Sequence, residues 1–259
     1  MLKRLIFAVY GVVCYVIFLG TFLYAIGFIG NLGTPTTLDG PARQPFGTAL
    51  AIDAGLLMLF AVQHSVMARQ WFKARWTRVV PKPVERSTYV LFSSLALILL
   101  FSEWRPMGGA VWSVTDPVGQ IVLRALFAFG WLLVLVSTFL INHFDLFGLR
   151  QVWLNLIGRP YTSLSFATPG PYRLVRHPLY VGWFFAFWMT PTMTLAHLVF
   201  AIATTSYILL AIRFEERDLV TFHGRAYEEY RRRVPMLVPF ARRQREEPAR
   251  GEASAASLR

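Results

Sequence analysis

Residues 171–219 read PYRLVRHPLYVGWFFAFWMTPTMTLAHLVFAIATTSYILLAIRFEERDL, a long apolar run with a charged cluster at each end. Residues 179–212 contain no Lys, Arg, Asp or Glu, and they exceed the roughly 20 residues with which one helix crosses a bilayer. Pro191 interrupts the run, because proline lacks a backbone N–H and disfavours helix in the residue before it. The sequence therefore predicts a helical hairpin with its tip near Pro191.

The two charged clusters are expected to meet, because a hairpin returns its second helix to the side from which the first began. Arg176 and His177 would then lie near Glu215 and Glu216. An arginine beside a membrane helix often serves only as an interfacial anchor. Adjacent carboxylates near the C-terminal end of a helix are different, because they face the negative end of the helix dipole. We therefore expect a cationic partner or ligand beside Glu215 and Glu216.

The composition is that of an integral membrane protein. Of the 259 residues, 55% are hydrophobic, more than an ordinary soluble domain contains. The formal net charge of +12 does not indicate a nucleic-acid partner, because the basic residues lie between apolar runs and not along one helix face. The single cysteine, Cys14, excludes an intramolecular disulfide and a cysteine-based metal site. We expect no bound metal.

Four further apolar runs predict four spanning helices ahead of the hairpin. The loops after the second and fourth runs are rich in Arg and Lys and are expected in the cytoplasm, whereas the loops between are nearly neutral. The expected fold is all-α, a polytopic membrane protein with both termini in the cytoplasm. Its expected parts are four spanning helices at residues 5–29, 46–67, 87–103 and 119–141, a C-terminal helical hairpin at 179–212, a cytoplasmic helix at 215–233 and a short interfacial helix at 151–157.

Residues 1–240 are expected to form a single membrane-embedded domain, with its most distinctive motifs in residues 171–239. Residues 241–259 have the composition of a disordered tail. The placement of Lys and Arg in the loops is sufficient to predict this orientation. The same orientation gathers the polar clusters at the cytoplasmic membrane face. There a soluble cofactor would meet a substrate dissolved in the bilayer.

The motifs in residues 176–239 follow the order and spacing of a membrane-enzyme signature. Arg-His-Pro-x-Tyr-x-Gly is matched at residues 176–182, Glu-Glu-x-x-Leu at 215–219, Gly-x-x-Tyr-x-x-Tyr at 224–230 and Val-Pro-x-x-Val-Pro at 234–239. In these motifs the chain resembles the integral-membrane isoprenylcysteine carboxyl methyltransferase family. The segments Gln63-His64-Ser65 and 142–151 are similar to a bacterial branch of that superfamily, the methanethiol S-methyltransferases.

The resemblance implies S-adenosylmethionine as the methyl donor and a small thiol as the acceptor, at the inner membrane of a bacterium. The residue types suit this donor, because carboxylates and aromatic rings stabilise a sulfonium cation and a guanidinium binds a carboxylate. The residues assigned to the cofactor are those that match the motifs, namely Arg176, His177, Tyr180, Gly182, Glu215, Glu216, Tyr227 and Tyr230.

A thiol attacks as its thiolate, so a nearby base or cation would assist its methylation. His64 and His143 are the candidate bases, since imidazole titrates near neutral pH. Asp145 is expected to orient His143, and Arg150 or Arg43 to favour a thiolate, although Arg43 falls on the opposite side of the predicted membrane.

Other interpretations remain open on the sequence alone. A larger lipid-borne thiol or carboxylate acceptor would need a tunnel open to lipid. His64 and His143, on neighbouring spans, are also typical of axial haem ligands, which would make the chain a redox protein. That alternative leaves the Arg-His-Pro and Glu-Glu motifs without a role. A non-catalytic scaffold would bind no cofactor, which the intact motifs oppose.

Overall fold

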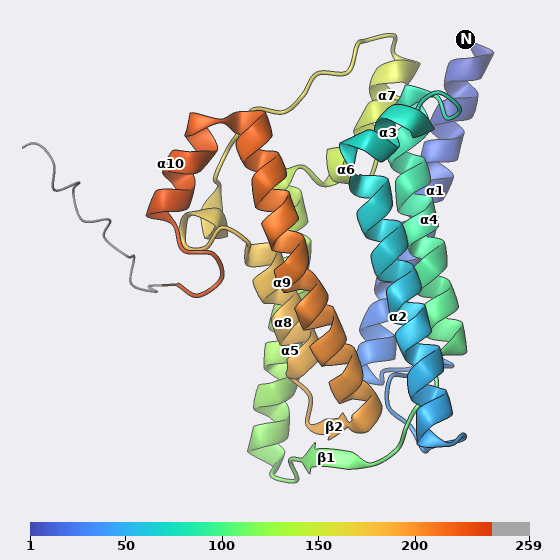
Figure 1. Cartoon of the computed structure of the whole chain (residues 1–259), viewed down its shortest axis with the longest axis vertical. Coiled ribbons are helices and arrows are strands. Elements are labelled where there is room, and N and C mark those ends of the chain that lie inside the picture. The colour runs from blue at the N-terminus through green and yellow to red at the C-terminus, as the bar shows by residue number, and fades with distance from the viewer. Residues whose placement is uncertain (240–259) are drawn as a thin grey trace, which may run out of the picture.

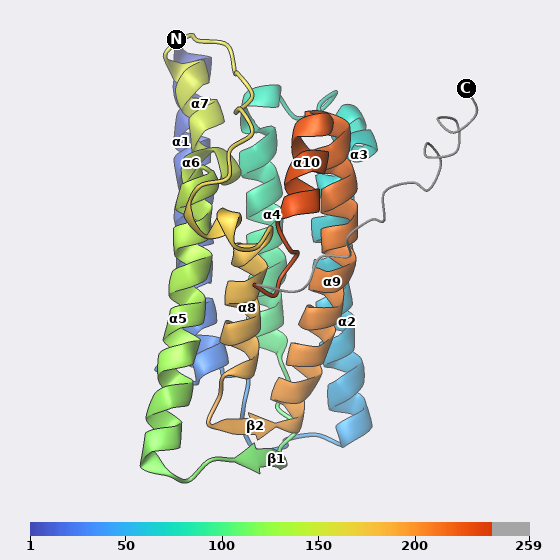
Figure 2. The same ribbon diagram turned by 90° about the vertical axis from the view of Figure 1, so that its left-hand side faces the viewer.

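The computed structural model describes residues 1–239, so the tail predicted for residues 241–259 lies outside the described residues. The regular secondary structure of the described chain is almost entirely helical, as Figures 1 and 2 show. Its elements are α1 (Leu2–Gly30), α2 (Phe46–Ala68), α3 (Gln70–Trp76), α4 (Lys82–Glu103), β1 (Ala110–Ser113), α5 (Pro117–Ile141), α6 (His143–Leu146), α7 (Leu149–Leu156), a 3-10 turn (Gly170–Arg173), α8 (Pro178–Trp188), β2 (Thr192–Thr194), α9 (Leu195–His223) and α10 (Arg225–Arg233).

Within residues 1–239, five helices, α1, α2, α4, α5 and α9, are long and apolar enough to cross a membrane. A helix suits the bilayer core because it satisfies its own backbone hydrogen bonds, while its apolar side chains face lipid. The first four correspond to the predicted spans, and α9 contains the second arm of the predicted hairpin. The prediction of an all-α polytopic membrane protein is therefore confirmed.

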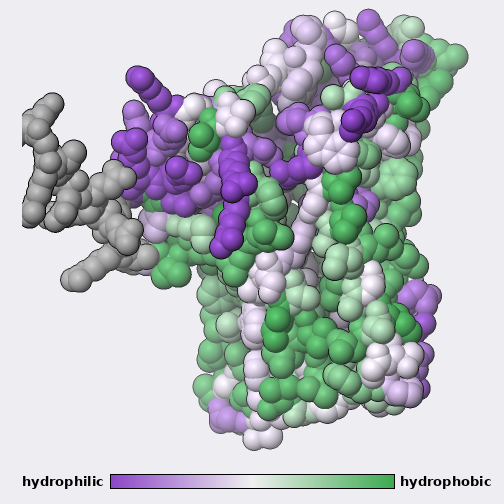
Figure 3. Space-filling view, in the orientation of Figure 1, coloured by the Kyte–Doolittle hydropathy of each residue, from purple (hydrophilic) through white to green (hydrophobic). Residues whose placement is uncertain are grey.

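The two ends of the bundle differ in polarity. Helices α3, α7 and α10 and the N-terminus lie at one end, here called the α10 end, and β1 and β2 lie at the other, the sheet end (Figure 1). Figure 3 shows hydrophilic residues concentrated at the α10 end and a largely hydrophobic surface over the remaining length. This distribution is expected when a bilayer surrounds the apolar part of the molecule.

The long helices form two groups. One group joins α1, α2 and α4, with α7 packed against α1, and the other joins α5, α8 and α9. Contacts between α2 and α9 connect the groups. Aromatic side chains fill the space between α1 and the second group, where Trp131 of α5 meets Phe22 of α1 edge-on at 5.2 Å between ring centroids.

The hairpin is more asymmetric than the sequence indicates. Helix α8 has 11 residues and is about 16 Å long, too short to cross a hydrocarbon core of about 30 Å. Helix α9 has 29 residues and is about 43 Å long. The helix predicted at 215–233 is divided in the structure, because α9 continues to His223 and the separate helix α10 covers only Arg225–Arg233. Gly224 then turns the chain into α10 at a φ of 55°, which glycine adopts without a Cβ clash.

A two-stranded antiparallel sheet covers the tip of the hairpin and was not predicted. Ala110 of β1 pairs with Thr194 of β2, and Ser113 pairs with Thr192. These segments are too short to show a strand pattern in the sequence. Their pairing satisfies backbone groups that the break at Pro191 leaves without helical partners.

Asp39 ties the loop between α1 and α2 to the start of α9. Its carboxylate accepts hydrogen bonds from Asn31 and Thr194 and lies 3.1 Å from Nδ1 of the buried His197. Burial raises the pKa of this carboxyl, but the hydrogen bond and charge of His197, with the other two hydrogen bonds, outweigh that effect and hold the pKa below its ordinary value. The loop is thereby fixed against the sheet end of the hairpin.

Candidate active site

The expected meeting of the two charged clusters is confirmed near the α10 end. Nε of Arg176, which precedes α8, donates to Oε1 of Glu216 on α9 at 2.7 Å. Nε2 of His177 lies 3.1 Å from the same oxygen. The side chains of Arg176 and Glu216 are only 11% and 13% exposed. A pair this buried needs additional hydrogen bonds to offset its lost hydration, and His177 supplies one of them.

Arg176 also holds the last described segment of the chain. One guanidinium nitrogen donates to the carbonyl of Val234 at 2.6 Å. The backbone N–H groups of Arg176 and His177 donate to the carbonyls of Pro235 and Met236 at 2.9 and 3.2 Å. Residues 234–236 therefore pair with the chain just before α8, and the closing Val-Pro motif is part of the site's framework.

Glu215 has a more open environment than Glu216. Its Oε2 accepts a hydrogen bond from the hydroxyl of Tyr180 at 2.8 Å. The Glu215 side chain is 44% exposed, against 13% for Glu216. Oε1 of Glu215 has no hydrogen-bond partner within residues 1–239. Of the two adjacent carboxylates, Glu215 is thus the one that a soluble cation can reach.

The two tyrosines of α10 face inward. The hydroxyl of Tyr230 donates to the carbonyl of Tyr172 at 2.6 Å, and burial raises the pKa of Tyr230 to about 12. The Tyr227 side chain is 2% exposed, and its buried hydroxyl has no partner among the described residues. The ring of Phe166 contacts both tyrosines edge-on. Tyr227 therefore presents an unused hydroxyl group inside the α10 region.

Gly182 lies at the closest approach of α8 and α5. A Cβ at this position would come within 2.8 Å of the carbonyl oxygen of Gly130 and 2.8 Å of a methyl group of Val134. A Cβ on Gly130 would likewise lie 2.7 Å from the carbonyl oxygen of Gly182. Small residues permit such close helix packing in membranes. The position of Gly182 supports the site through helix packing.

His64 lies in a polar cluster between α2 and α4. Its Nε2 and Nδ1 are 2.9 and 3.0 Å from the hydroxyl of Tyr89, and its Nδ1 is also 3.2 Å from Oγ of Ser93. Phe60 stacks on the imidazole at 5.2 Å between ring centroids. His64 as a whole is half-buried.

The last turns of α2 face the part of α9 that carries Glu215. Oγ of Ser65 lies 2.9 Å from the hydroxyl of Tyr207, eight residues before Glu215 in the chain. Arg69 forms an ion pair of 3.2 Å with Asp218, three residues after Glu215. These two contacts bracket Glu215 along α9 and bring the His64 region to the same part of the molecule.

His143 has a closed environment. Its Nδ1 is 2.9 Å from the hydroxyl of Thr138, and its Nε2 is 2.8 Å from the hydroxyl of Tyr15. Phe139 stacks on its ring at 4.2 Å between centroids. The residue is 4% exposed, and burial lowers the pKa of its imidazole below the ordinary value. Both ring nitrogens are already occupied, which favours a structural role.

The expectation that Asp145 orients His143 is wrong within the described structure. Asp145 instead accepts hydrogen bonds from Arg150 at 2.9 Å and from Tyr161 at 3.3 Å. Arg150 also donates to the carbonyl of Thr162 at 2.8 Å. The opposite charges are 18–22% exposed and hold the connector after α7 against α6. Carboxylate and guanidinium are satisfied by one another, and neither contacts His143.

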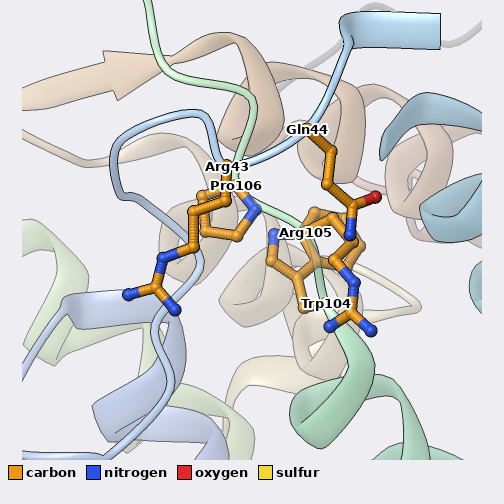
Figure 4. A pocket seen from close by; sticks show the side chains of 5 residues that line it. All are labelled: Arg43, Gln44, Trp104, Arg105 and Pro106. Atoms are coloured by element: carbon orange, nitrogen blue, oxygen red, sulfur yellow. The ribbon is translucent and has the colours of Figure 1, made fainter. Parts of the chain in front are cut away.

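Arg43 lies far from these residues, as its place in the sequence predicts. It lines a small pocket of about 130 Å³ at the sheet end, together with Gln44, Trp104, Arg105 and Pro106. Figure 4 shows the guanidinium groups of Arg43 and Arg105 extending separately and not toward a shared point. The pocket therefore gives Arg43 no part in a site at the α10 end.

Sequence comparison identifies the family of the chain. A methanethiol S-methyltransferase from Crocosphaera subtropica is 62% identical over 239 residues, which cover 92% of this chain and 94% of that protein. One from Mycobacterium tuberculosis is 52% identical over 242 residues, covering 93% of this chain and 99% of that protein. The chain belongs to the methanethiol S-methyltransferase family.

More distant similarity agrees with a wider superfamily. Nurim from Pan troglodytes is 33% identical to this methyltransferase over 205 residues, which cover 72% of this chain and 78% of Nurim. No model of a protein family and no solved structure matches the chain.

Tyr89 and Ser93 are residues of the methyltransferase that sequence reasoning missed. They are four residues apart on α4, so they lie on one face of the helix and both reach His64. A signal was present, because polar side chains inside a predicted span commonly have a specific partner. Their partner could not be identified without knowing that α2 packs against α4.

Proposed function

We propose that the chain methylates methanethiol with S-adenosylmethionine, giving dimethyl sulfide. The observation that carries the proposal is the 62% identity to a methanethiol S-methyltransferase over 92% of the chain. The paired clusters at the α10 end support the same chemistry, because they place an accessible carboxylate, aromatic rings and a candidate base in one region.

The donor set near Glu215 fits S-adenosylmethionine. This cofactor supplies an electrophilic methyl group on a positively charged sulfur. Glu215 is half-exposed, and one of its oxygens has no hydrogen-bond partner among the described residues. Tyr180 places an aromatic ring beside it. A carboxylate and an aromatic face both stabilise a cation. The unpartnered hydroxyl of Tyr227 offers a further hydrogen-bonding group.

The remaining motif residues have different roles in this proposal. Arg176, His177 and Glu216 bind one another and hold α8, α9 and residues 234–236 together around the cofactor. Tyr230 fixes α10 to the turn before α8 through its hydrogen bond to Tyr172. Gly182 allows α8 to approach α5. These groups act mainly by holding the reacting atoms in attack geometry, which contributes much of the catalysis in a displacement.

His64 is the proposed base, in preference to His143. His64 is half-buried and lies on the segment of α2 that faces α9, whereas His143 is buried, at 4% exposed. Removing the proton of methanethiol produces the thiolate, which is the stronger nucleophile. Asp145 and Arg150 retain a structural role in the connector after α7.

The proposed orientation places the α10 end in the cytoplasm of a bacterium, with the protein in the inner membrane and both termini inside. Basic residues of the segment between α2 and α4 support it, since Arg and Lys favour the cytoplasmic side. A water-soluble cofactor would then reach Glu215 directly, and the small apolar thiol would arrive from the bilayer or the cytoplasm.

The function is tested by headspace gas chromatography. Protein purified in detergent is incubated with S-adenosylmethionine and methanethiol, beside samples lacking protein or cofactor. Dimethyl sulfide above both controls is the expected result. Binding of S-adenosylmethionine without dimethyl sulfide would contradict the acceptor and direct the search to larger lipid-borne acceptors. Absence of both binding and product would contradict the proposal as a whole.

A further inference from the structure

The hydroxyl group of Ser93 has only one proton, and a backbone carbonyl lies where it can accept that proton. Oγ of Ser93 donates to the carbonyl oxygen of Tyr89, one turn earlier on α4, at 3.0 Å. A carbonyl oxygen can only accept, so this contact uses the proton of the hydroxyl. Toward any other neighbour, Oγ of Ser93 can therefore act only as an acceptor.

The other neighbour of Ser93 is Nδ1 of His64, at 3.2 Å. Because Oγ can only accept there, Nδ1 must carry a proton for this contact to be a hydrogen bond. In a neutral imidazole the second nitrogen, Nε2, then carries the lone pair. The hydroxyl of Tyr89 lies 2.9 Å from Nε2 and 3.0 Å from Nδ1, so it sits over the ring and not along the in-plane lone pair of either nitrogen. Tyr89 therefore leaves the lone pair of Nε2 open to the thiol.

The opposite tautomer fits poorly. If Nδ1 carries no proton, its lone pair faces a lone pair of Ser93 Oγ, and the two atoms are only 3.2 Å apart. The hydroxyl of Tyr89 cannot relieve this repulsion, because it lies over the ring and not along the lone pair of Nδ1. The stacked Phe60 ring limits rotation of the imidazole away from this position.

We propose that Ser93 is a positioning residue that holds His64 in the Nδ1–H tautomer, so that Nε2 is the atom that removes the proton of the thiol. This inference rests on the proposed function, in which His64 is the base. The thiol proton moves to Nε2, and the sulfur electron pair forms the new bond to the methyl carbon. The bond between that carbon and the donor's sulfur breaks, and its electron pair stays on that sulfur, which loses its positive charge.

A matched control exists in the next residue. Oγ of Ser94 donates to the carbonyl of Val90 at 2.9 Å, the same contact to the preceding turn that Ser93 makes, but Ser94 does not touch His64. Ser94→Ala therefore reproduces the loss of one hydroxyl and one helix contact. Ser93→Thr keeps a hydroxyl that can donate to the preceding turn, and it serves as the rescue variant.

The test measures the rate of dimethyl sulfide formation against pH for Ser93→Ala, Ser93→Thr, Ser94→Ala and His64→Gln. Ser93→Ala should lower kcat on the order of tenfold, a part of the 10²–10⁴-fold that a positioned base contributes. In Ser93→Ala the acidic limb of the pH–rate profile should move to lower pH. The serine oxygen accepts from Nδ1–H and stabilises the imidazolium more than the neutral ring, so its loss makes the imidazole harder to protonate. Ser93→Thr should restore activity, and Ser94→Ala should match the unsubstituted protein.

Nitrogen NMR of histidine-labelled protein gives a readout that needs no activity. The His64 signal, assigned by its loss in His64→Gln, should show the Nδ1–H tautomer in the unsubstituted protein and a mixture in Ser93→Ala. If Ser93→Ala and Ser94→Ala behave equally in both experiments while His64→Gln is impaired, the proposed role of Ser93 would be overturned and His64 would remain the base. Full activity of His64→Gln would instead overturn the proposed base and leave the Ser93 hydrogen bond as a structural contact.

Discussion

Glu215 and Glu216 are adjacent in the chain, yet they have different surroundings. Successive helix residues point about 100° apart, so one carboxylate faces the buried Arg176 and the other faces the accessible side of Tyr180. The buried carboxylate is satisfied inside the protein, and the exposed one keeps a free oxygen. At the residue scale, the Glu-Glu motif combines a carboxylate bound inside the protein with one that a soluble cation can reach.

Glu215→Gln should weaken binding of S-adenosylmethionine. The substitution keeps the size and the hydrogen bond from Tyr180 but removes the negative charge that would face the sulfonium. Because an ion pair between partly exposed groups contributes up to about 1 kcal/mol, the dissociation constant should rise about fivefold. Isothermal titration calorimetry in detergent measures it.

Glu229→Gln is the matched control, since Glu229 is exposed on α10. It should bind the cofactor like the unsubstituted protein. Equal affinities for Glu215→Gln and Glu229→Gln would contradict the assignment of Glu215.

At the element scale, the position of α8 depends on contacts at both of its ends. Near its start, Gly182 lies against Gly130 of α5. Beyond its end, Asp39 and His197 fasten the hairpin tip to the loop after α1. Helix α8 is too short to span a bilayer, so these contacts, more than its own length, determine where the Arg-His-Pro motif sits.

Gly182→Ala should destabilise the protein by about 1–3 kcal/mol, the usual cost of forcing extra atoms into a packed interface. The added Cβ would meet backbone atoms of α5, which cannot rotate away. Thermal unfolding in detergent measures the effect.

Gly20→Ala is the comparison, because a Cβ at Gly20 of α1 meets nothing within 4 Å. Alanine favours helix over glycine, so this variant should be as stable as the unsubstituted protein or slightly more so. A loss of stability in both variants would argue against a special role for the contact between α5 and α8.

The Asp39 contact should make stability depend on acid. The pKa of Asp39 in the folded protein lies below its ordinary value of 3.8, so the carboxylate stabilises the fold fully above that pH. As pH falls from 3.8 through the lower folded pKa, this contribution should disappear. Unfolding curves between pH 5 and pH 2 should decline less steeply for Asp39→Asn than for the unsubstituted protein, and parallel curves would contradict the contact.

At the scale of the whole molecule, six traverses of the chain place the N-terminus and α10 at the same end. The shortest of them is α8, the fifth in the chain, which goes only part of the way and returns through β2 to α9 (Figure 2). This path of the chain brings the Arg-His-Pro motif, the Glu-Glu motif and the end of α2 to one end of the bundle. A cofactor from one aqueous compartment can then meet all of them.

Cysteine labelling should establish the orientation. Native Cys14 is 1% exposed and should give little background. Val111→Cys, at the sheet end, should react with a membrane-impermeant maleimide added to intact spheroplasts, whereas Arg225→Cys, at the start of α10, should react only after lysis. The reverse pattern would contradict a cytoplasmic active site.

The linear order of residues was sufficient for the spans and for the meeting of the two charged clusters. Apolar runs long enough to cross a bilayer leave few alternatives to helices, because exposed backbone groups cannot be satisfied in lipid. Pro191 required a turn between α8 and α9, and a turn brings Arg176 to Glu216. Local composition and a single break were enough for these conclusions.

Other features depended on three-dimensional packing. Three of these features involve side chains from separate helices. They are the different surroundings of Glu215 and Glu216, the hydrogen-bond partners of His143, and the contact of Ser93 with His64. Periodicity shows that a residue is on a helix, but the rotation of that helix against its neighbours determines which groups touch. Such contacts are set by close packing across helix interfaces, and that packing exists only once the whole chain has folded.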